Sequence, residues 1–306
     1  MAHVTFVHGI SNMRSPDLVL EAWKRALARN DGIDLGAEGV TSSFMYWADV
    51  MYPEPRADDD INESADDGVA EADLDDVDLS FVDEADGDER AWLQAVSDKY
   101  QLDAAEDEAP PPAEPDSPLL ERIPLPWFLK KRIMAIFLRD VHHYLFDVDH
   151  TPRPGTHYKV QTEIRRRFQE SLSEAAASGP PHIVVAHSMG TVISYDNLKR
   201  VPDCLPIDGL ITLGSPLGLD EIQDKLRPEW TRDTGFPDSV ARWVNIYDRF
   251  DPVVGLDARF GNDYRKGGEN AVVDINEQNW GKFRHAVTKY LAGPRMREEL
   301  GSMLEL

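Results

Sequence analysis

The segment at 182–190 constrains the fold of this chain more strongly than any other. Residues 182–185 form an apolar run typical of a buried strand, and Ala186-His187-Ser188-Met189-Gly190 follows directly. Small residues two before and two after a serine permit a sharp turn that brings the next helix close to the strand. Glycine usually fills both places, so Ala186 departs by one methyl group. We predict a strand, a strained turn presenting Ser188, and a helix; a serine that caps an ordinary strand-to-helix turn is the alternative.

A serine hydroxyl is a poor nucleophile at neutral pH, so catalysis by Ser188 requires a nearby base and an acid that orients it. His285 is the only histidine after Ser188 in the chain, and it lies between a loop-like stretch at 279–282 and a helical pattern at 286–291. The order Ser, Asp, His along the chain therefore predicts His285 as the base. A histidine at the surface or at a helix cap is the alternative.

The acid is expected at the end of a strand between these two residues. The stretch 243–247 has the β-branched and aromatic content of a buried strand, and a turn with two aspartates follows. We favour Asp251, because it lies deeper in the loop and Pro252 biases its backbone toward an extended conformation. Asp248 is the alternative, with a turn-forming or arginine-paired role as its other interpretation.

A negatively charged reaction intermediate also requires backbone N–H donors. Residues 2–7 alternate as a short strand, the polar loop His8-Gly9-Ile10-Ser11-Asn12 follows, and 16–28 reads as a helix. One donor is expected from Gly9 or, preferably, Ile10, and the second from Met189. We expect His8 to hold this loop by hydrogen bonding and not to act as a base.

With these parts the chain resembles a serine esterase or lipase of the α/β-hydrolase superfamily, over residues 1–50 and 152–306. The segments that carry the resemblance are Val7-His8-Gly9, Ala186-His187-Ser188-Met189-Gly190, Leu213-Gly214-Ser215-Pro216, Asp251-Pro252-Val253 and His285. The resemblance implies hydrolysis of carboxylic esters through an acyl-enzyme, with no metal or organic cofactor. The roles it implies are a catalytic triad of Ser188, Asp251 and His285 and an oxyanion hole built from Gly9, Ile10 and Met189.

Net charge is concentrated in one segment. Residues 54–121 hold 25 acidic and three basic residues, which accounts for 22 of the 24 net negative charges of the chain. The remainder is close to neutral and offers no basic stripe, so we expect no nucleic-acid partner. The high charge and low aromatic content of 58–87 predict a flexible loop. The start of this segment resembles a calcium-binding loop, but the glycine and the final glutamate that such a loop requires are absent. Residues 109–118 are rich in proline and indicate a spacer.

Two helices are predicted within the same insertion. The first spans 89–100, with Trp92, Leu93 and Val96 facing inward, and the second is a strongly apolar helix within 125–146. We favour a cap over the mouth of the active site for the second helix; an ordinary core helix and a helix at a membrane surface are the alternatives. Four histidines at 142, 143, 150 and 157 lack the regular spacing of zinc ligands, so we expect them to be solvated.

Strands alternating with helices predict an α/β protein with a doubly wound, mostly parallel sheet of the α/β-hydrolase kind, carrying an acidic loop and a helical cap as an insertion. The expected strands lie at 2–7, 40–47, 182–185, 207–213, 242–247 and 271–275, and the expected core helices at 16–28, 158–177 and 191–200. Residues 1–53 and 152–306 would form the core. The insertion, 54–151, divides into an acidic part at 54–121 and the cap at 122–151. Deletion of 57–118 is expected to spare the core.

A single cysteine, Cys204, and an immediate entry into the first strand suggest a cytoplasmic protein. The expected partner is a small-molecule or lipid ester, with transient contact to a membrane surface possible through the cap. Two other function classes stay open. An acyltransferase or thioesterase could use the same triad with another acceptor, and a non-catalytic interaction protein could retain the scaffold while misplacing His285.

Overall fold

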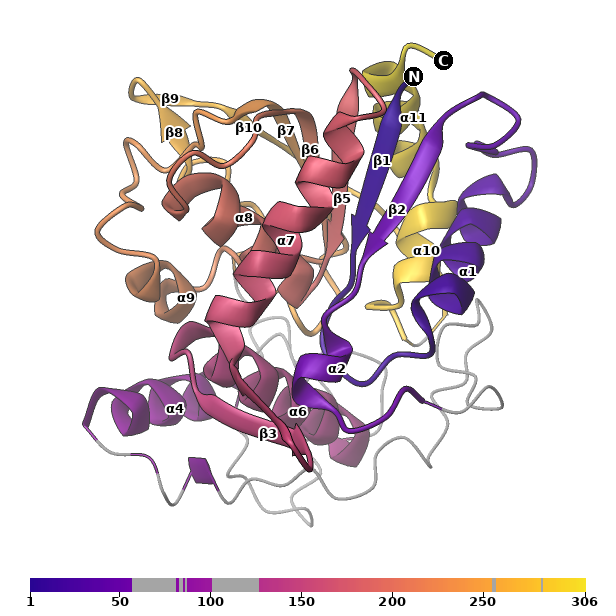
Figure 1. Cartoon of the computed structure of the whole chain (residues 1–306). Coiled ribbons are helices and arrows are strands. Elements are labelled where there is room, and N and C mark those ends of the chain that lie inside the picture. The colour runs from indigo at the N-terminus through magenta and orange to yellow at the C-terminus, as the bar shows by residue number, and fades with distance from the viewer. Residues whose placement is uncertain (57–80, 83–84, 86, 101–126, 255–256, 282) are drawn as a thin grey trace.

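The structure is a computed structural model that describes residues 1–306 apart from 57–80, 83–84, 86, 101–126, 255–256 and 282. Its centre is a parallel sheet of six strands in the order β10-β7-β6-β5-β1-β2 (Figure 1). The sheet and its flanking helices confirm the predicted α/β class. The strands are β1 (His3–Val7), β2 (Thr41–Met45), β5 (His182–His187), β6 (Ile207–Leu213), β7 (Val240–Tyr247) and β10 (Val272–Asn276).

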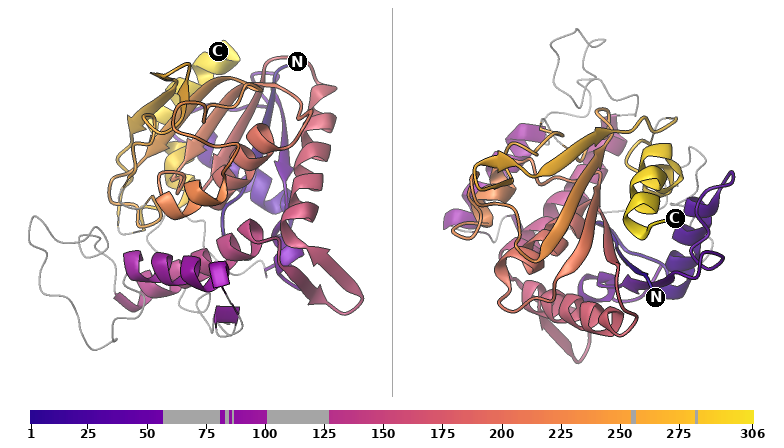
Figure 2. Two further views of the ribbon diagram at one scale, coloured as in Figure 1. Left: turned by 90° about the vertical axis from the view of Figure 1, so that its left-hand side faces the viewer. Right: turned by 90° about the horizontal axis from the view of Figure 1, so that it is seen from above.

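Helices cover both faces of this sheet, so its strands are apolar on both sides. On β5, Ile183 and Val185 face one cluster of buried side chains, whereas Val184 and Ala186 face the other, as the two-residue period of a strand requires. The views in Figure 2 show the two helical layers, one on each side of the strands. The first layer holds α7 (Val160–Ala176) and α8 (Met189–Arg200), and the second holds α1 (Pro16–Ala28), α10 (Val287–Ala292) and α11 (Pro294–Leu304).

A third group of elements lies beyond the carboxyl ends of the strands, at the bottom of Figure 1. This group is α2 (Ala48–Met51), α4 (Gly87–Tyr100), α6 (Trp127–Leu145) and the antiparallel hairpin of β3 (Asp149–Arg153) and β4 (Thr156–Lys159). The apolar helix predicted within 125–146 is therefore α6, and it lies beyond the carboxyl ends of the strands, where the predicted site loops begin. Most of its apolar residues from 133 onward are buried in the main core cluster, and the helix packs against α7 and α8.

The hairpin and several short elements were not anticipated. Tyr158 and Lys159 were expected to begin the long helix but belong to β4, so α7 starts at Val160. The remaining short elements are α9 (Asp220–Lys225), β8 (Arg265–Lys266) and β9 (Glu269–Asn270). None of the helices in the described part of the chain is long and apolar enough to cross a membrane.

Helix α4 is part of the core and not a separable appendage. Trp92, Leu93, Val96 and Tyr100 are buried in the same cluster as the helices on the sheet, and the Trp92 indole N–H donates to the Glu221 carbonyl at 2.8 Å. The inward face predicted for this helix is correct. Deletion of 57–118 would therefore also remove side chains that are buried in the core.

Replacing Trp92 with alanine is therefore expected to lower the free energy of unfolding by about 3–5 kcal/mol, the usual cost of removing a large buried aromatic side chain. Urea unfolding of the variant would measure this loss. Gln94→Ala, at an exposed position of the same helix, is the matched control and should change stability by less than about 0.5 kcal/mol. An unchanged midpoint for the Trp92 variant would show that α4 is not part of the cooperative core.

The expectation of solvated histidines is wrong for His142 and His143, which are buried on α6. Phe81 stacks on His142 with ring centroids 5.0 Å apart, and burial lowers the pKa of both histidines to about 4. Ala85 is also buried. Within the predicted flexible loop at 58–87, the structure describes only 81–82, 85 and Gly87, which begins α4. The other residues of that loop, its calcium-like motif and the spacer at 109–118 lie outside the described residues.

Candidate functional site

The predicted site loops all leave the sheet at its carboxyl edge, where ligands of such sheets bind. Ala186 pairs with Val7 across β5 and β1, and the Ser188 N–H donates to the Leu213 carbonyl at 2.9 Å. The next turn follows the same pattern, because the Gly214 N–H donates to the Ile246 carbonyl of β7 at 3.1 Å. Parallel register thus brings the ends of β1, β5, β6 and β7 together.

Ser188 stands on a strained turn between β5 and α8. Its φ of 53° and ψ of −127° fall in a region that residues other than glycine rarely adopt. Neighbouring backbones crowd this turn: a Cβ on Gly190 would lie 2.5 Å from the His8 carbonyl oxygen, and one on Gly9 would lie 2.6 Å from Ser188 Cβ. These close approaches explain why glycine occurs at positions 9 and 190.

His285 and Asp251 are hydrogen-bonded to each other. His285 Nδ1 lies 2.8 Å from Asp251 Oδ2, and both side chains are buried. Asp251 Oδ1 also accepts the Val253 N–H at 2.9 Å. The alternative acid, Asp248, instead pairs with Arg284 at 3.0 Å and accepts the Phe250 N–H, the arginine-paired, turn-forming role that was its other interpretation.

Ser188 Oγ and His285 Nε2 are both buried without a hydrogen-bond partner in the described structure, as are Asn279 Oδ1, Arg284 Nε and Thr288 Oγ1 from the same stretch of chain as His285. Buried polar groups are normally hydrogen-bonded, and orphaned ones require an explanation. The residue before the serine, His187, bridges the two loops, since its Nε2–H donates to the His285 carbonyl at 2.8 Å. The His187 and His285 rings lie 4.5 Å apart. An unsatisfied hydroxyl and an unsatisfied imidazole nitrogen thus occur on adjoining loops.

His187 is a weak base. It is buried, and desolvation, followed by the proximity of His285, holds its pKa well below the usual value. As a neutral imidazole that donates from Nε2, it fixes the backbone of the His285 loop against the serine turn. Sequence reasoning did not assign this role, because the two residues are 98 positions apart.

Tyr290 on α10 supports the aspartate and was also missed. Its hydroxyl donates to Asp251 Oδ2 at 2.8 Å and accepts the Asp248 N–H at 2.9 Å. Burial and the nearby Asp251 charge raise the pKa of Tyr290 well above its ordinary value, so the hydroxyl keeps its proton. The shared oxygen of Asp251 therefore faces two donors, Tyr290 and His285.

Tyr290→Phe is expected to lower kcat by about tenfold, because hydrogen bonds to charged groups contribute about 1.5–3 kcal/mol and part of this orients Asp251. Steady-state ester hydrolysis, measured below the melting temperature of the variant, would test this. Tyr264→Phe removes an equally buried hydroxyl, bonded to the Leu217 carbonyl at 2.7 Å and away from Asp251, and is the control. Equal effects of both changes would rule out a specific role for Tyr290.

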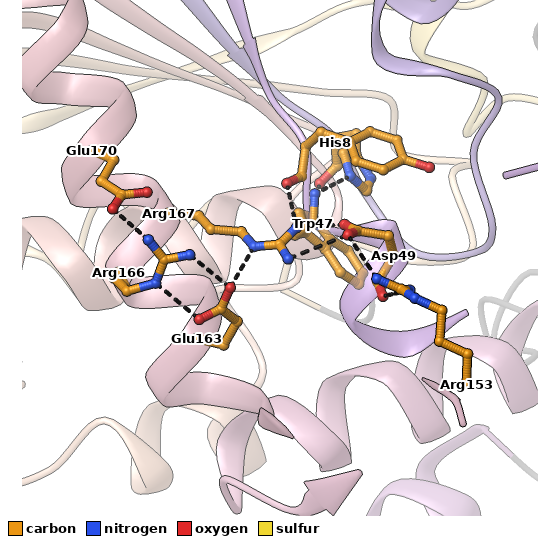
Figure 3. Close-up of polar contacts among 9 residues, drawn as sticks. His8, Trp47, Asp49, Arg153, Glu163, Arg166, Arg167 and Glu170 are labelled. Carbon is orange, nitrogen blue, oxygen red and sulfur yellow. Dashed lines mark hydrogen bonds and ion pairs between the residues drawn. The ribbon is translucent and has the colours of Figure 1, made fainter. Parts of the chain in front are cut away.

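His8 holds the loop after β1, as expected. Its Nδ1–H donates to the Gly9 carbonyl at 2.9 Å, and its Nε2 accepts the Trp47 N–H at 3.1 Å (Figure 3). Complete burial lowers the pKa of His8 to about 3 despite the bond to Gly9, so the ring is neutral at physiological pH. The ring stacks on Trp47 at 4.6 Å. Beside this contact, Figure 3 shows Arg167 between Glu163 and Asp49, an ion-pair network that fixes α7 against α2.

Of the three residues expected to supply oxyanion donors, Gly9 and Met189 lie directly beside the serine. Met189 is the first residue of α8, at the positive end of the helix dipole. Gly9 lies against Ser188, as its close approach shows, and Ile10 is partly buried against the main core cluster. No group of three or more metal-ligating side chains occurs among the residues that the structure describes.

Comparison with known proteins leaves the family open. No family model matches the chain, and no curated protein is similar to it in sequence. A crystal structure of an uncharacterized protein from Pseudomonas aeruginosa matches with a TM-score of 0.32 and 13% sequence identity, over 95% of this chain and 45% of that one. The chain thus spans less than half the length of that structure. A likeness at this level supports no assignment of family or activity.

Proposed function

We propose that the protein is a serine hydrolase with an α/β-hydrolase fold that cleaves carboxylic esters through an acyl-enzyme. The observation that carries the proposal is that Ser188 Oγ and His285 Nε2 are both buried without a hydrogen-bond partner in the described structure. Asp251 already orients the same His285 ring through its bond to Nδ1. A serine, a base and an acid that orients the base are the parts that nucleophilic acyl transfer requires.

In the proposed reaction, Ser188 Oγ attacks the acyl carbonyl carbon and His285 Nε2 takes the hydroxyl proton. The carbonyl oxygen becomes negatively charged, and the N–H groups of Ile10 and Met189 stabilise it. Collapse of this intermediate breaks the ester C–O bond, and His285 returns the proton to the departing alcohol. Water then attacks the acyl carbonyl carbon while His285 Nε2 takes one of its protons. Collapse of the second intermediate breaks the bond to Ser188 Oγ, and His285 returns the proton to that oxygen, which releases the acid and restores Ser188.

Asp251 acts through the imidazole. Its bond to Nδ1 keeps the proton of neutral His285 on that nitrogen, which leaves the Nε2 lone pair available as the base. The negative charge of Asp251 also stabilises the imidazolium that forms during attack. Burial of both side chains strengthens this interaction, because little water screens it.

Hydrolysis of p-nitrophenyl esters from acetate to dodecanoate would test the proposal and define the acyl preference. We expect turnover, with the free acid as product even when a short alcohol or a thiol competes with water. Preferential transfer to the added acceptor would instead assign the acyltransferase alternative. Failure to turn over any ester in the series would contradict the proposed function.

A further inference from the structure

Asp140 on α6 contacts the loop that follows β1. This carboxylate is completely buried, and its Oδ2 accepts the Ser11 N–H at 2.8 Å. The same group accepts the Tyr52 hydroxyl at 2.9 Å and the Arg139 guanidinium at 2.8 Å. A buried carboxylate of the insertion is therefore bonded to the backbone of the loop after β1.

This bond completes a pair of restraints on either side of Ile10. A trans peptide is planar, with its C=O and N–H pointing in opposite directions, so fixing one group orients the other. His8 Nδ1–H holds the Gly9 carbonyl, which belongs to the same peptide as the Ile10 N–H. Asp140 holds the Ser11 N–H, which belongs to the following peptide. Both peptide planes that flank the Ile10 Cα are thereby fixed.

The loop needs such restraint. Ser11 has a φ of 82°, in the left-handed region that side chains rarely adopt, and such conformations persist only where surrounding contacts impose them. The Ser11 N–H has Asp140 as its acceptor, and the carboxylate charge shortens and strengthens the bond. Without Asp140 the Ile10-Ser11 peptide would lose the contact that opposes its rotation.

We propose that Asp140 is a positioning residue that fixes the Ile10–Ser11 peptide, so that α6, together with His8, restrains the backbone that carries the Ile10 N–H. The inference rests on the proposed function of this loop. Asp140 does not touch the reacting atoms in this account; it acts through Ser11. Helix α6 thus contributes to stabilisation of the transition state through this loop.

Asp196 provides a matched control. It is a second completely buried carboxylate, bonded to Arg165, Arg200 and to Tyr144, which lies on the same helix α6. Its partners lie on α6, α7 and α8 and do not include the oxyanion loop. Asp140→Ala and Asp196→Ala therefore both remove a buried, arginine-paired carboxylate that tethers α6, and only the first change frees Ser11.

The test combines ester kinetics with amide hydrogen exchange over residues 8–13. Loss of one oxyanion donor costs about 100- to 1,000-fold in kcat, so partial misplacement by Asp140→Ala should cost about 10- to 100-fold. We expect KM to change by less than about twofold, since the donor acts on the transition state. Asp140→Asn keeps an acceptor for Ser11 and should recover most of kcat. The Ser11 amide should exchange faster in Asp140→Ala only.

The outcomes separate this inference from the function on which it rests. Absence of ester turnover in the unmodified protein would overturn the proposed function. Unchanged Ser11 exchange in Asp140→Ala, or an equal fall in kcat for Asp140→Ala and Asp196→Ala at matched folded fractions, would overturn the positioning role. If Asp140→Ala does not fold, Asp140→Asn provides the test. A fall in its kcat of about 100-fold without faster exchange of the Ser11 amide would overturn the positioning role.

Discussion

Ser188→Ala is expected to reduce kcat for ester hydrolysis by about 10⁶-fold, the scale seen when the nucleophile of a serine triad is removed. The reason is that Ser188 carries the proposed nucleophile on the strained turn at φ 53° beside the His285 loop. Stability should not fall, because Ser188 Oγ makes no hydrogen bond in the described structure and its loss relieves a buried, unsatisfied group. Steady-state kinetics and thermal unfolding measure the two effects.

Ser194→Ala is the matched control for this change. Ser194 is equally buried on α8, and its hydroxyl donates to the Gly190 carbonyl at 2.7 Å, within the helix itself. We expect this variant to keep kcat within about threefold, which corresponds to less than 1 kcal/mol. Comparable residual activity in the two variants would place the nucleophile elsewhere.

Asp251→Asn is expected to reduce kcat by about 10⁴-fold while the protein remains folded, the scale known for this change in serine triads. The amide would offer its NH₂ or its oxygen to His285 Nδ1, and the charge that stabilises the imidazolium would be absent. Oδ1 of Asp251 accepts the Val253 N–H, so the asparagine oxygen is expected to stay with that donor and to place the NH₂ at the Oδ2 position, which faces His285 Nδ1. That arrangement favours the unproductive tautomer.

Asp248→Asn distinguishes this mechanism from a general effect on the loop. Asp248 is also buried and lies in the same turn, but its partners are Arg284 and the backbone N–H groups of Phe250 and Asn279. The variant should lose stability, since it breaks a buried ion pair, and retain kcat within about tenfold. A larger loss of kcat in Asp248→Asn than in Asp251→Asn would reverse the assignment of the acid.

The sheet could be predicted because its strands are rich in apolar residues and alternate with helical patterns, as at β5, β6 and β7. The β3–β4 hairpin could not, because none of its residues is buried and its sequence shows no alternation of apolar side chains. The exposure of His142 and His143 was misjudged for a related reason. Their burial depends on packing between α4, α6 and Phe81, which no local pattern records.

The candidate site divides in the same way. Ser188, Asp251 and His285 could be proposed because each follows a recognisable strand or loop and their order along the chain is restrictive. The supporting contacts of Tyr290 and His187 join positions 39 and 98 residues apart. Asp140 reaches Ser11 from 129 residues away, on a helix whose sequence indicates only an apolar face. Such contacts follow from tertiary packing, and a single sequence gives no signal for them.

Reaction with a fluorophosphonate, followed by mass spectrometry of the labelled peptides, tests the central claim most directly. The reagent phosphonylates a serine only where a base activates its hydroxyl, so it reports the nucleophile without requiring the right ester. We predict one adduct, on Ser188, that is absent in Ser188→Ala and persists in Ser194→Ala. Labelling that persists in Ser188→Ala, or no labelling of the unmodified protein, would contradict the proposed catalytic site.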